Sequence, residues 1–148
     1  LPPDMEFFRD FINAERGMLQ KLIIIEGLVR GKLPLVCDDS IVEGFTSRNL
    51  VRGFHALGVR DLVFLSSVPP YRYPCFFGLH TKNPQNFVAA RRQTQQLINE
   101  WMGCRVLYPT IEQVLATPEL QGRKFCTACF TGDYPVKLPR ELRSQYGL

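Results

Sequence analysis

One stretch of the sequence, residues 35–67, limits the possible folds more than any other. Its first part, the apolar run "LVC", ends in two adjacent acids, Asp38 and Asp39. After a polar loop, four apolar residues recur at the spacing of one helical face: Leu50, Val51, Phe54 and Leu57. The run "DLVFLSS" at 61–67 then predicts a second strand. A strand, a helix and a strand in this order form a βαβ unit with parallel strands and a right-handed crossover, which predicts an α/β fold.

The helix of this unit has recognisable ends. Thr46 or Ser47 is a suitable cap for its first turn, and Gly58 directly follows its last apolar residue. Upstream of the unit, residues 4–22 predict a short amphipathic helix, and the β-branched run "LIII" at 22–25 predicts a strand.

Downstream of the unit, the pattern predicts a long helix, a strand and a short helix. The long helix starts with Asn83 as cap and Pro84 as first residue, ends at Gly103, and should bury one stripe: Phe87, Ala90, Leu97, Ile98 and Trp101. "VLYP" at 106–109 predicts a short strand, and Thr110 can cap a helix that runs to residue 120. The chain from residue 121 on should be irregular, with its last part on the surface.

Composition narrows the classes of protein. The 148 residues fit at most one domain, and 45% hydrophobic residues allow a modest core. A net charge of +4 favours anionic partners weakly, but no run of Lys and Arg exceeds two residues, which argues against nucleic acid as a partner. No apolar stretch approaches the ~18–20 residues of a membrane span. The chain starts at Leu1 without a signal-peptide pattern, and we expect it to be a piece of a longer protein.

The acid pair and the loop behind it predict a binding site. Ligands of open α/β sheets bind beyond the carboxyl ends of the strands, where Asp38 and Asp39 stand. The start of the following helix favours an anion, Gly44 allows a close approach of the backbone, and three hydroxyls are nearby donors: Ser40, Thr46 and Ser47. Carboxylates next to an anion site suggest a sugar phosphate, whose hydroxyls the acids bind directly or through Mg²⁺. Alternatively, the acids are turn residues and Thr46 is only a cap.

The five cysteines indicate a reduced compartment rather than a disulfide framework. Cys126 and Cys129 have the spacing of a ligand pair, and Cys75 lies in a Pro-flanked loop. This set is compatible with zinc, with a redox role or with no function, and thiolates suit zinc or iron–sulfur. For Cys37 and Cys104 we expect buried apolar packing.

Three segments together resemble a known family. "VCDDSIVEGFTSRNLV" at 36–51 resembles the phosphoribosyl pyrophosphate (PRPP) loop of type I phosphoribosyltransferases, in the form found in the glutamine PRPP amidotransferases. "SSVPPYRYPCFFG" at 66–78 and "CTACFTGDYP" at 126–135 agree with that family in the same order. The resemblance implies part of a type I phosphoribosyltransferase fold, namely a parallel sheet with flanking helices, followed by an irregular C-terminal segment. Residues 1–120 would be the C-terminal part of the transferase domain, and 121–148 the cysteine-containing segment.

The resemblance also implies an activity and roles for the loop residues. Asp38 and Asp39 would bind the ribose 2- and 3-hydroxyls of PRPP, with Mg²⁺ as a further candidate ligand. The remaining loop residues would hold the 5-phosphate: Ser40, Gly44, Thr46 and Ser47. Lys21 would fall loosely in a basic segment near a mobile catalytic loop. The parent enzyme would transfer glutamine-derived ammonia to PRPP, which gives 5-phosphoribosylamine in the first committed step of purine synthesis. Its N-terminal glutaminase domain would lie outside this chain.

The cysteines gain a specific meaning from the same resemblance. One branch of the family carries a 4Fe–4S cluster, three of whose ligands match Cys75, Cys126 and Cys129. The fourth ligand, upstream in the family, is missing from this chain. The implied parent is cytoplasmic and homo-oligomeric, with PRPP and glutamine as partners. The alternatives are a non-catalytic PRPP-loop remnant or regulatory paralogue, and a zinc-bound interaction module.

Several residues depart from the family pattern or admit a structural role. Glu43 and Glu26 stand where family members carry Arg, and Phe45 where Thr is common. Structural roles are expected for both histidines, His55 and His80, and core packing for Phe87 and Trp101. The aromatic stretch 71–73 could face the ligand crevice or pack against other aromatics.

Overall fold

A three-stranded parallel sheet organises the computed structural model, which describes residues 24–79, 81, 83–146 and 148. The strands are β1 (Leu35–Asp38), β2 (Val63–Ser66) and β3 (Arg105–Leu107), in the spatial order β1-β2-β3. β1 and β2 are parallel, as are β2 and β3. The predicted βαβ unit and the α/β class with a parallel sheet are therefore confirmed, although β3 begins one residue earlier and ends two residues earlier than predicted.

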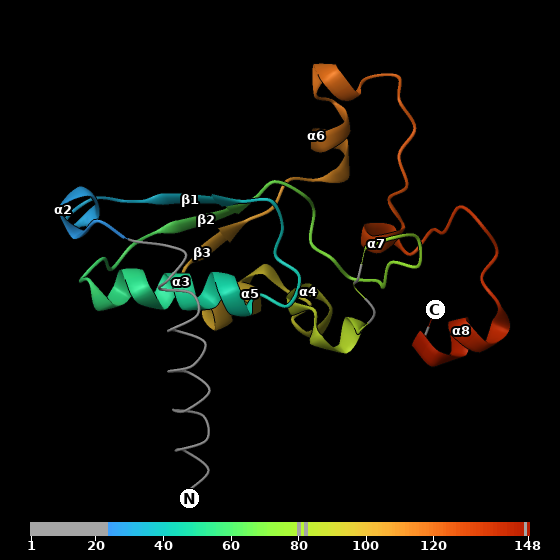
Figure 1. The fold of residues 1–148 in the computed structure, drawn as a ribbon, viewed down its shortest axis with the longest axis horizontal. Helices are drawn as coiled ribbons and strands as arrows, with labels where there is room; N and C mark the ends of the chain where they lie inside the picture. Colours follow the sequence, from blue (N-terminus) through green and yellow to red (C-terminus); the bar gives the residue numbers. More distant parts are fainter. Residues whose placement is uncertain (1–23, 80, 82, 147) are drawn as a thin grey trace, which may run out of the picture.

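Helices cover one face of this sheet (Figure 1). α3 (Phe45–Ala56) and α5 (Gln95–Met102) run along that face, and α4 (Val88–Arg91) precedes α5. The other helices are short: α2 (Glu26–Val29), α6 (Ile111–Leu115), α7 (Ala128–Thr131) and α8 (Arg140–Tyr146). Single 3₁₀ turns occupy Pro84–Asn86 and Pro118–Leu120. Within the described residues, no helix is long and apolar enough to cross a membrane.

The main core lies between the sheet and these helices. Val36, Phe64 and Val106 form one cross-strand row, and all three belong to the core that Val51, Phe54, Ile98 and Met102 complete from the helices. The next row, Cys37, Leu65 and Leu107, points to the other side of the sheet because side chains alternate along a strand. None of the helices in the described part of the chain covers that side (Figure 1), and Leu35 there is 61% exposed.

The predicted strand at 22–25 is wrong where the structure describes it. Ile24 and Ile25 are not in a strand, and the chain turns into α2 at Glu26. Ile24 packs against the main core, and its Cδ1 lies 3.3 Å from the position that a Cβ on Gly53 of α3 would take. Ile24 therefore packs against helix α3 instead of pairing in a strand. The amphipathic helix predicted at 4–22, with Lys21, lies outside the described residues.

The long helix predicted from 83 to 103 is divided. Arg92 is extended, and Thr94 starts α5 by accepting a hydrogen bond from the Leu97 amide at 3.3 Å. The break also changes the predicted stripe: Phe87 and Ile98 are buried as expected, but Leu97 is 47% exposed, so its predicted burial is wrong. Gly103 ends α5 in the left-handed conformation, as its position predicts.

The predicted caps and tail were partly right. α3 starts two or three residues earlier than expected, with Gly44 as N-cap, so that Thr46 and Ser47 lie within its first turn. Thr110 forms a capping box with Gln113, but Pro118 limits α6 to five residues and leaves a 3₁₀ turn behind it. The tail contains α7 and α8, and α8 has no buried residue, which confirms its surface position. The proposed boundary between 1–120 and 121–148 stays a prediction.

Candidate functional site

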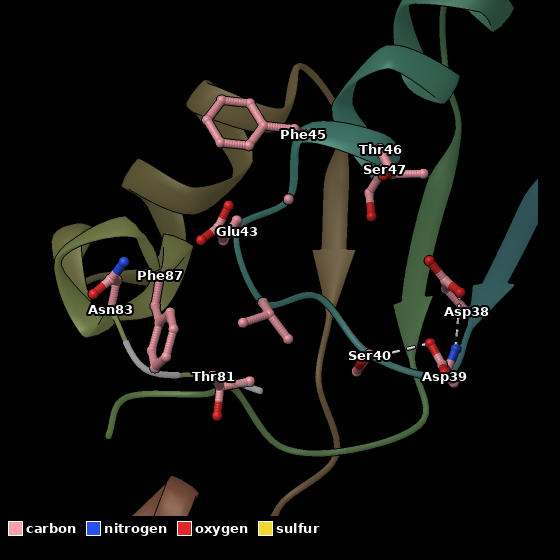
Figure 2. Close-up of a pocket in the computed structure, with 12 residues that line it drawn as sticks. Asp38, Asp39, Ser40, Glu43, Phe45, Thr46, Ser47, Thr81, Asn83 and Phe87 are labelled. Atoms are coloured by element: carbon pink, nitrogen blue, oxygen red, sulfur yellow. Dashed lines mark hydrogen bonds between the residues drawn. The ribbon is translucent and has the colours of Figure 1, made fainter. Parts of the chain in front are cut away.

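A cavity of about 750 Å³ opens beyond the carboxyl end of β1, between the acid pair and the start of α3 (Figure 2). Its wall contains every residue that the sequence predicted for sugar-phosphate binding: Asp38, Asp39, Ser40, Gly44, Thr46 and Ser47. The convergence of these six residues is therefore confirmed, while their ligand stays a prediction.

Backbone hydrogen bonds hold the acid pair at the end of the strand. The Asp39 amide donates to Asp38 Oδ1 at 3.0 Å, and Ser40 Oγ donates to Asp39 Oδ1 at 3.5 Å. The carbonyl of Asp38 accepts from the amide of Ser67 at 2.9 Å and from its hydroxyl at 3.0 Å. The end of β1 is thus fixed to the residue that follows β2, so that the carboxylates face the cavity from a rigid element.

The electrostatics of the acid pair favour a ligand that donates hydrogen bonds or carries positive charge. Partial burial is the main cause that raises the pKa of Asp38, the hydrogen bond from the Asp39 amide opposes it, and the charge of Asp39 adds to the rise. Ribose hydroxyls or a divalent cation with its oxygen-preferring coordination would relieve this cost.

The opposite side of the cavity is the N-terminal turn of α3. Ser47 is 4% exposed and Thr46 is exposed, and Figure 2 shows both on the helix turn that faces the acid pair. The first amides of an α-helix have no acceptor within the helix, and the helix dipole is positive at this end. The cavity therefore has an acceptor side and a donor side.

Gly44 is required by its conformation and by its neighbours. Its φ is +72°, and a Cβ there would stand 2.6 Å from Val88 Cγ2 and 2.8 Å from Trp101 Cζ3. Because Gly44 has no side chain, Val88 of α4 and Trp101 of α5 can pack closely against the loop. This packing fixes the direction in which α3 starts.

Two of the three departures from the family pattern, Glu43 and Phe45, lie at this loop and differ in their contacts. Glu43 lines the cavity and is exposed, and its Oε1 accepts from Asn86 Nδ2 at 3.3 Å. Phe45 is 59% exposed, with its ring centroid 6.3 Å from that of Trp101. Glu26 lies on α2, before β1 and outside the cavity lining, where it pairs with Arg30. Only Glu43 therefore changes the charge of the cavity wall.

A distant segment completes the wall, which sequence reasoning missed. Thr81, Asn83 and Phe87 line the cavity from beyond β2, and Val42 lines it from the loop. Phe87 is 1% exposed, so its predicted core role is confirmed, but one side of it also faces the site. Asn83 was recognisable only as a helix cap, and no signal in the sequence placed Thr81 here.

The cysteine segment lies next to the aromatic stretch 71–73. The amides of Arg72 and Tyr73 donate to the carbonyl of Cys129 at 3.0 and 3.1 Å. Burial raises the pKa of the Cys129 thiol to about 11, and the charges of Cys75 and Cys126 add to this rise. Across residues 24–79, 81, 83–146 and 148, however, no three Cys, His, Asp or Glu side chains form a group that could hold a metal ion.

Other candidate residues have structural positions. The His55 ring nitrogens lie 2.8 Å from the Val59 carbonyl oxygen and 2.9 Å from that of Gly103, which confirms a structural role. Trp101 is half-buried against the main core, and the guanidinium carbons of two arginines lie 4.7 and 4.3 Å from its ring centroid: Arg48 and Arg92. His80 lies outside the described residues.

Three predictions remain, for Cys104, for Cys37 and for the aromatic stretch 71–73. Cys104 is half-buried against the main core, and burial raises the pKa of its thiol to about 11, as apolar packing predicts. Cys37 is exposed, so its predicted burial is wrong, because it stands on the uncovered side of β1. Residues 71–73 are absent from the cavity lining, and Tyr71 packs against Phe130 with ring centroids 5.0 Å apart.

Comparison with known proteins agrees with the geometry. No family model matches the chain. The amidophosphoribosyltransferase of Synechococcus elongatus is 38% identical over 131 residues, which cover 87% of this chain and 26% of that protein. Amidophosphoribosyltransferase 1, chloroplastic, of Arabidopsis thaliana is 34% identical over 143 residues, which cover 94% of this chain and 24% of that protein. The chain thus spans about a quarter of the length of the curated relatives it matches.

The solved structures point the same way. Glutamine PRPP amidotransferase from B. subtilis, complexed with ADP and GMP, superposes with a TM-score of 0.68 at 30% sequence identity, over 86% of this chain and 30% of that one. A structure described as the allosteric regulatory enzyme of purine biosynthesis gives the same score and identity over 83% of this chain. This chain belongs, as a segment of partial length, to the amidophosphoribosyltransferase family.

Proposed function

We propose that the cavity binds PRPP and that the whole protein is an amidophosphoribosyltransferase. This enzyme would replace the pyrophosphate of PRPP by ammonia from glutamine and release 5-phosphoribosylamine, the first committed step of purine synthesis. The glutaminase part and most of the transferase part would lie outside this chain. The observation that carries the proposal is the convergence of six family-matched residues on one cavity wall.

The two sides of the cavity suit the two ends of a phosphorylated pentose. Asp38 and Asp39 present acceptors for the ribose 2- and 3-hydroxyls. The hydroxyls of Thr46 and Ser47, with the first amides of α3, present donors to the 5-phosphate. Charge-assisted hydrogen bonds of this kind are stronger than neutral ones. The ligand would be fixed at both ends, with its anomeric carbon between them.

This placement serves the reaction. As the bond to pyrophosphate breaks and the bond to ammonia forms, positive charge develops on the sugar, and the electron pair of the broken bond leaves with the pyrophosphate. The carboxylates of Asp38 and Asp39 are aimed at the sugar and stabilise that charge. The same oxygens fit a divalent cation, and Mg²⁺ bound with the substrate would supply charge neutralisation for the leaving group.

The structure gives less support to a metal site at the cysteines than to a binding site in the cavity. A 4Fe–4S cluster on Cys75, Cys126 and Cys129 stays a prediction for the whole protein, with its fourth ligand outside this chain. The described side chains do not form a metal-holding group, so we assign no step of the reaction to a cluster. The zinc-bound module finds no support in this arrangement for the same reason. A cytoplasmic, homo-oligomeric parent rests on the resemblance alone.

Glu43 favours a second candidate, a non-catalytic remnant that binds PRPP weakly or not at all. A carboxylate on the cavity wall opposes a phosphate by ~1 kcal/mol at a screened site. Glu43 accepts a hydrogen bond from Asn86, and Figure 2 shows its carboxylate on the side of Asn83 and Phe87, away from Thr46 and Ser47. We favour the enzyme over the remnant because this contact keeps the negative charge of Glu43 away from the first turn of α3, where the phosphate would bind.

Calorimetric titration of PRPP with Mg²⁺ into the 148-residue chain tests the proposal. We expect binding, which Asp39→Asn weakens about tenfold or more because a hydrogen bond to a charged group is lost. Asp61→Asn, a matched charge change on an exposed acid outside this cavity, should leave the affinity unchanged. Glu43→Arg should strengthen binding several-fold.

The outcomes separate the candidates. Binding by the chain as it stands supports the enzyme. Binding only after Glu43→Arg supports the remnant. If neither protein binds PRPP, or if Asp39→Asn and Asp61→Asn weaken binding equally, the cavity is not the PRPP site.

A further inference from the structure

The single tryptophan of the chain, Trp101 in α5, packs against the loop that leads into α3. A Cβ on Gly44, the N-cap of α3, would stand 2.8 and 3.2 Å from the Cζ3 and Cη2 atoms of this indole. The indole also meets the Phe45 ring edge-on, with centroids 6.3 Å apart and ring planes at 71°. Gly44 and Phe45 line the cavity, whereas Trp101 does not. The indole therefore supports the binding loop without touching the cavity itself.

Two arginines stack on the same indole. The guanidinium carbons of Arg48 and Arg92 lie 4.7 and 4.3 Å from its ring centroid. Arg48 belongs to α3 and Arg92 is the C-cap of α4, so that the indole of α5 joins three helices. The face of an indole attracts a cation more strongly than other aromatic rings do, and an aliphatic side chain lacks this attraction. The ring therefore holds both arginines through its electrons as well as through its volume.

The stacking opposes a repulsion between like charges. Burial lowers the pKa of Arg48 most, and the charges of Arg52 and Arg92 lower it further. Burial and the charge of Arg91 likewise lower the pKa of Arg92. Contact with the electron-rich face of Trp101 offsets part of this cost for both stacked arginines. Loss of the ring should therefore release both arginines from their present positions.

The place of this cluster matters because the first turn of α3 is the donor side of the cavity. The Arg48 amide donates to the Gly44 carbonyl at 2.9 Å, which closes that turn. The amides that precede Arg48 in the helix have no acceptor within it, so they are available to a ligand. Trp101 contacts both residues of the closing bond, Gly44 by packing and Arg48 by stacking. The position of the ring and the direction of the available amides are thus linked.

We propose that Trp101 is a positioning residue for ligand binding, which directs the first amides of α3 into the cavity and is itself held by its stacking with Arg48 and Arg92. The proposal rests on the proposed function, because it takes PRPP as the ligand. A displacement of binding groups by about 1 Å can cost up to about 100-fold. Replacing the ring should therefore weaken PRPP, although no group that touches PRPP is removed.

Substitutions at Trp101 test this role by calorimetric titration of PRPP with Mg²⁺ into the 148-residue chain. We expect Trp101→Leu to weaken PRPP about tenfold, because the ring face is lost, and Trp101→Phe to recover most of the affinity. Met102→Ala is the control on the same helix, because Met102 is 1% exposed in the main core and does not line the cavity. It should lower the melting temperature at least as much as Trp101→Leu and leave the affinity unchanged. Ile98→Val, a smaller loss in the same core, replaces it if Met102→Ala does not fold.

A pair of arginine variants tests the stacking separately. Arg92→Met keeps an apolar stem and removes the charge over the ring, and Arg91→Met removes the same charge from the exposed residue before it. Both variants lower the net charge equally, so any general attraction for the phosphates falls equally in the two. We expect Arg92→Met to bind PRPP about threefold more weakly than Arg91→Met, in line with the strength of an exposed cation–π contact. Equal affinities would contradict the role of the stacking.

The outcomes separate positioning from a merely structural role and from a failure of the proposed function. The proposal is overturned if Trp101→Leu binds PRPP as the unchanged chain does, or if Trp101→Leu and Met102→Ala weaken it equally. If the unchanged chain binds no PRPP, the proposed function fails, and amide hydrogen exchange of the ligand-free chain tests the positioning. Trp101→Leu should then speed exchange of the Arg48 amide several-fold relative to the Phe54 amide of the same helix, and Met102→Ala should not. An unchanged ratio in Trp101→Leu would refute the role.

Discussion

The cavity and the cysteine segment both match the same family by motif, but the described residues form only the cavity and not a metal site. Its six predicted residues all lie within 38–47, at a strand end and the helix turn that follows. Neighbours in sequence supply these six residues, while Ser67 holds the end of β1 and Val88 and Trp101 pack against Gly44. The cysteines come from residue 75 and from 126–129, and the described side chains there form no metal-holding group. A local site follows from local structure, whereas a site built from distant segments depends on everything that holds them together.

The largest difference between the two regions should come from their glycines. Gly44→Ala places a methyl group 2.6 Å from Val88 Cγ2 at a φ of +72°, and strain plus overpacking should cost about 3 kcal/mol of unfolding free energy. Gly132→Ala in the cysteine segment meets the Tyr73 ring at 3.2 Å and a φ of +84°, and should cost about 1 kcal/mol. Urea titration of both variants measures the contrast. Equal costs would mean that the cavity loop is no better defined than the cysteine segment.

The regions should also differ in the pH range over which they affect stability. The Cys129 thiol has its pKa raised from 9.0 to about 11, mainly by burial. Below pH 9 the thiol is protonated in both the folded and the unfolded state. Between about pH 9 and 11 only the unfolded state ionises, so the free energy of unfolding falls as pH rises.

Cys129→Ala should therefore reduce the loss of stability between pH 8 and pH 10, as measured by urea midpoints at the two values. Cys104→Ala should do the same in the main core, because that thiol is raised to about 11 by burial alone. An unchanged pH slope in Cys129→Ala would show that its thiol is solvated in solution.

The smallest effect is expected at the acid end of the range. The pKa of Asp38 is raised above its usual 3.8, so the folded state holds the proton more tightly than the unfolded state. The penalty is complete above the raised pKa and absent below about pH 3.8. Asp38→Asn should then stabilise the chain at pH 7 by ~0.5 kcal/mol or less, since solvent screens a group this exposed. Asp61→Asn serves as control, and a loss of stability in Asp38→Asn would contradict the prediction.

How much the sequence could predict follows the same division. The βαβ unit, the parallel direction of its strands and the cavity residues were predictable because periodicity and the strand-end rule act over short distances. The cap at Thr110 was recognisable for the same reason, although its capping box with Gln113 was not predicted. The break before Thr94 was hidden, because the apolar residues continue across it, and it left Leu97 exposed instead of buried.

The failures arose where a distant partner decides. Ile24 and Ile25 have strand-like side chains, but α3 rather than a strand receives Ile24. Cys37 was predicted to be buried, but no helix of the described residues covers its side of the sheet. The wall at Thr81 and Asn83 belongs to the cavity only after the chain has returned past β2. The spacing of neighbouring residues in the sequence does not indicate any of these contacts.

The central claim is that the strand end and the first turn of α3 form one binding surface for a phosphorylated pentose. Backbone amide spectra of the isotope-labelled chain during a PRPP titration with Mg²⁺ test it most directly. The account predicts saturable shifts that are largest at residues 38–47, with smaller ones at Phe87 and none at Cys104. Shifts that spread evenly over the chain, or that centre elsewhere while 38–47 stay unchanged, would contradict it.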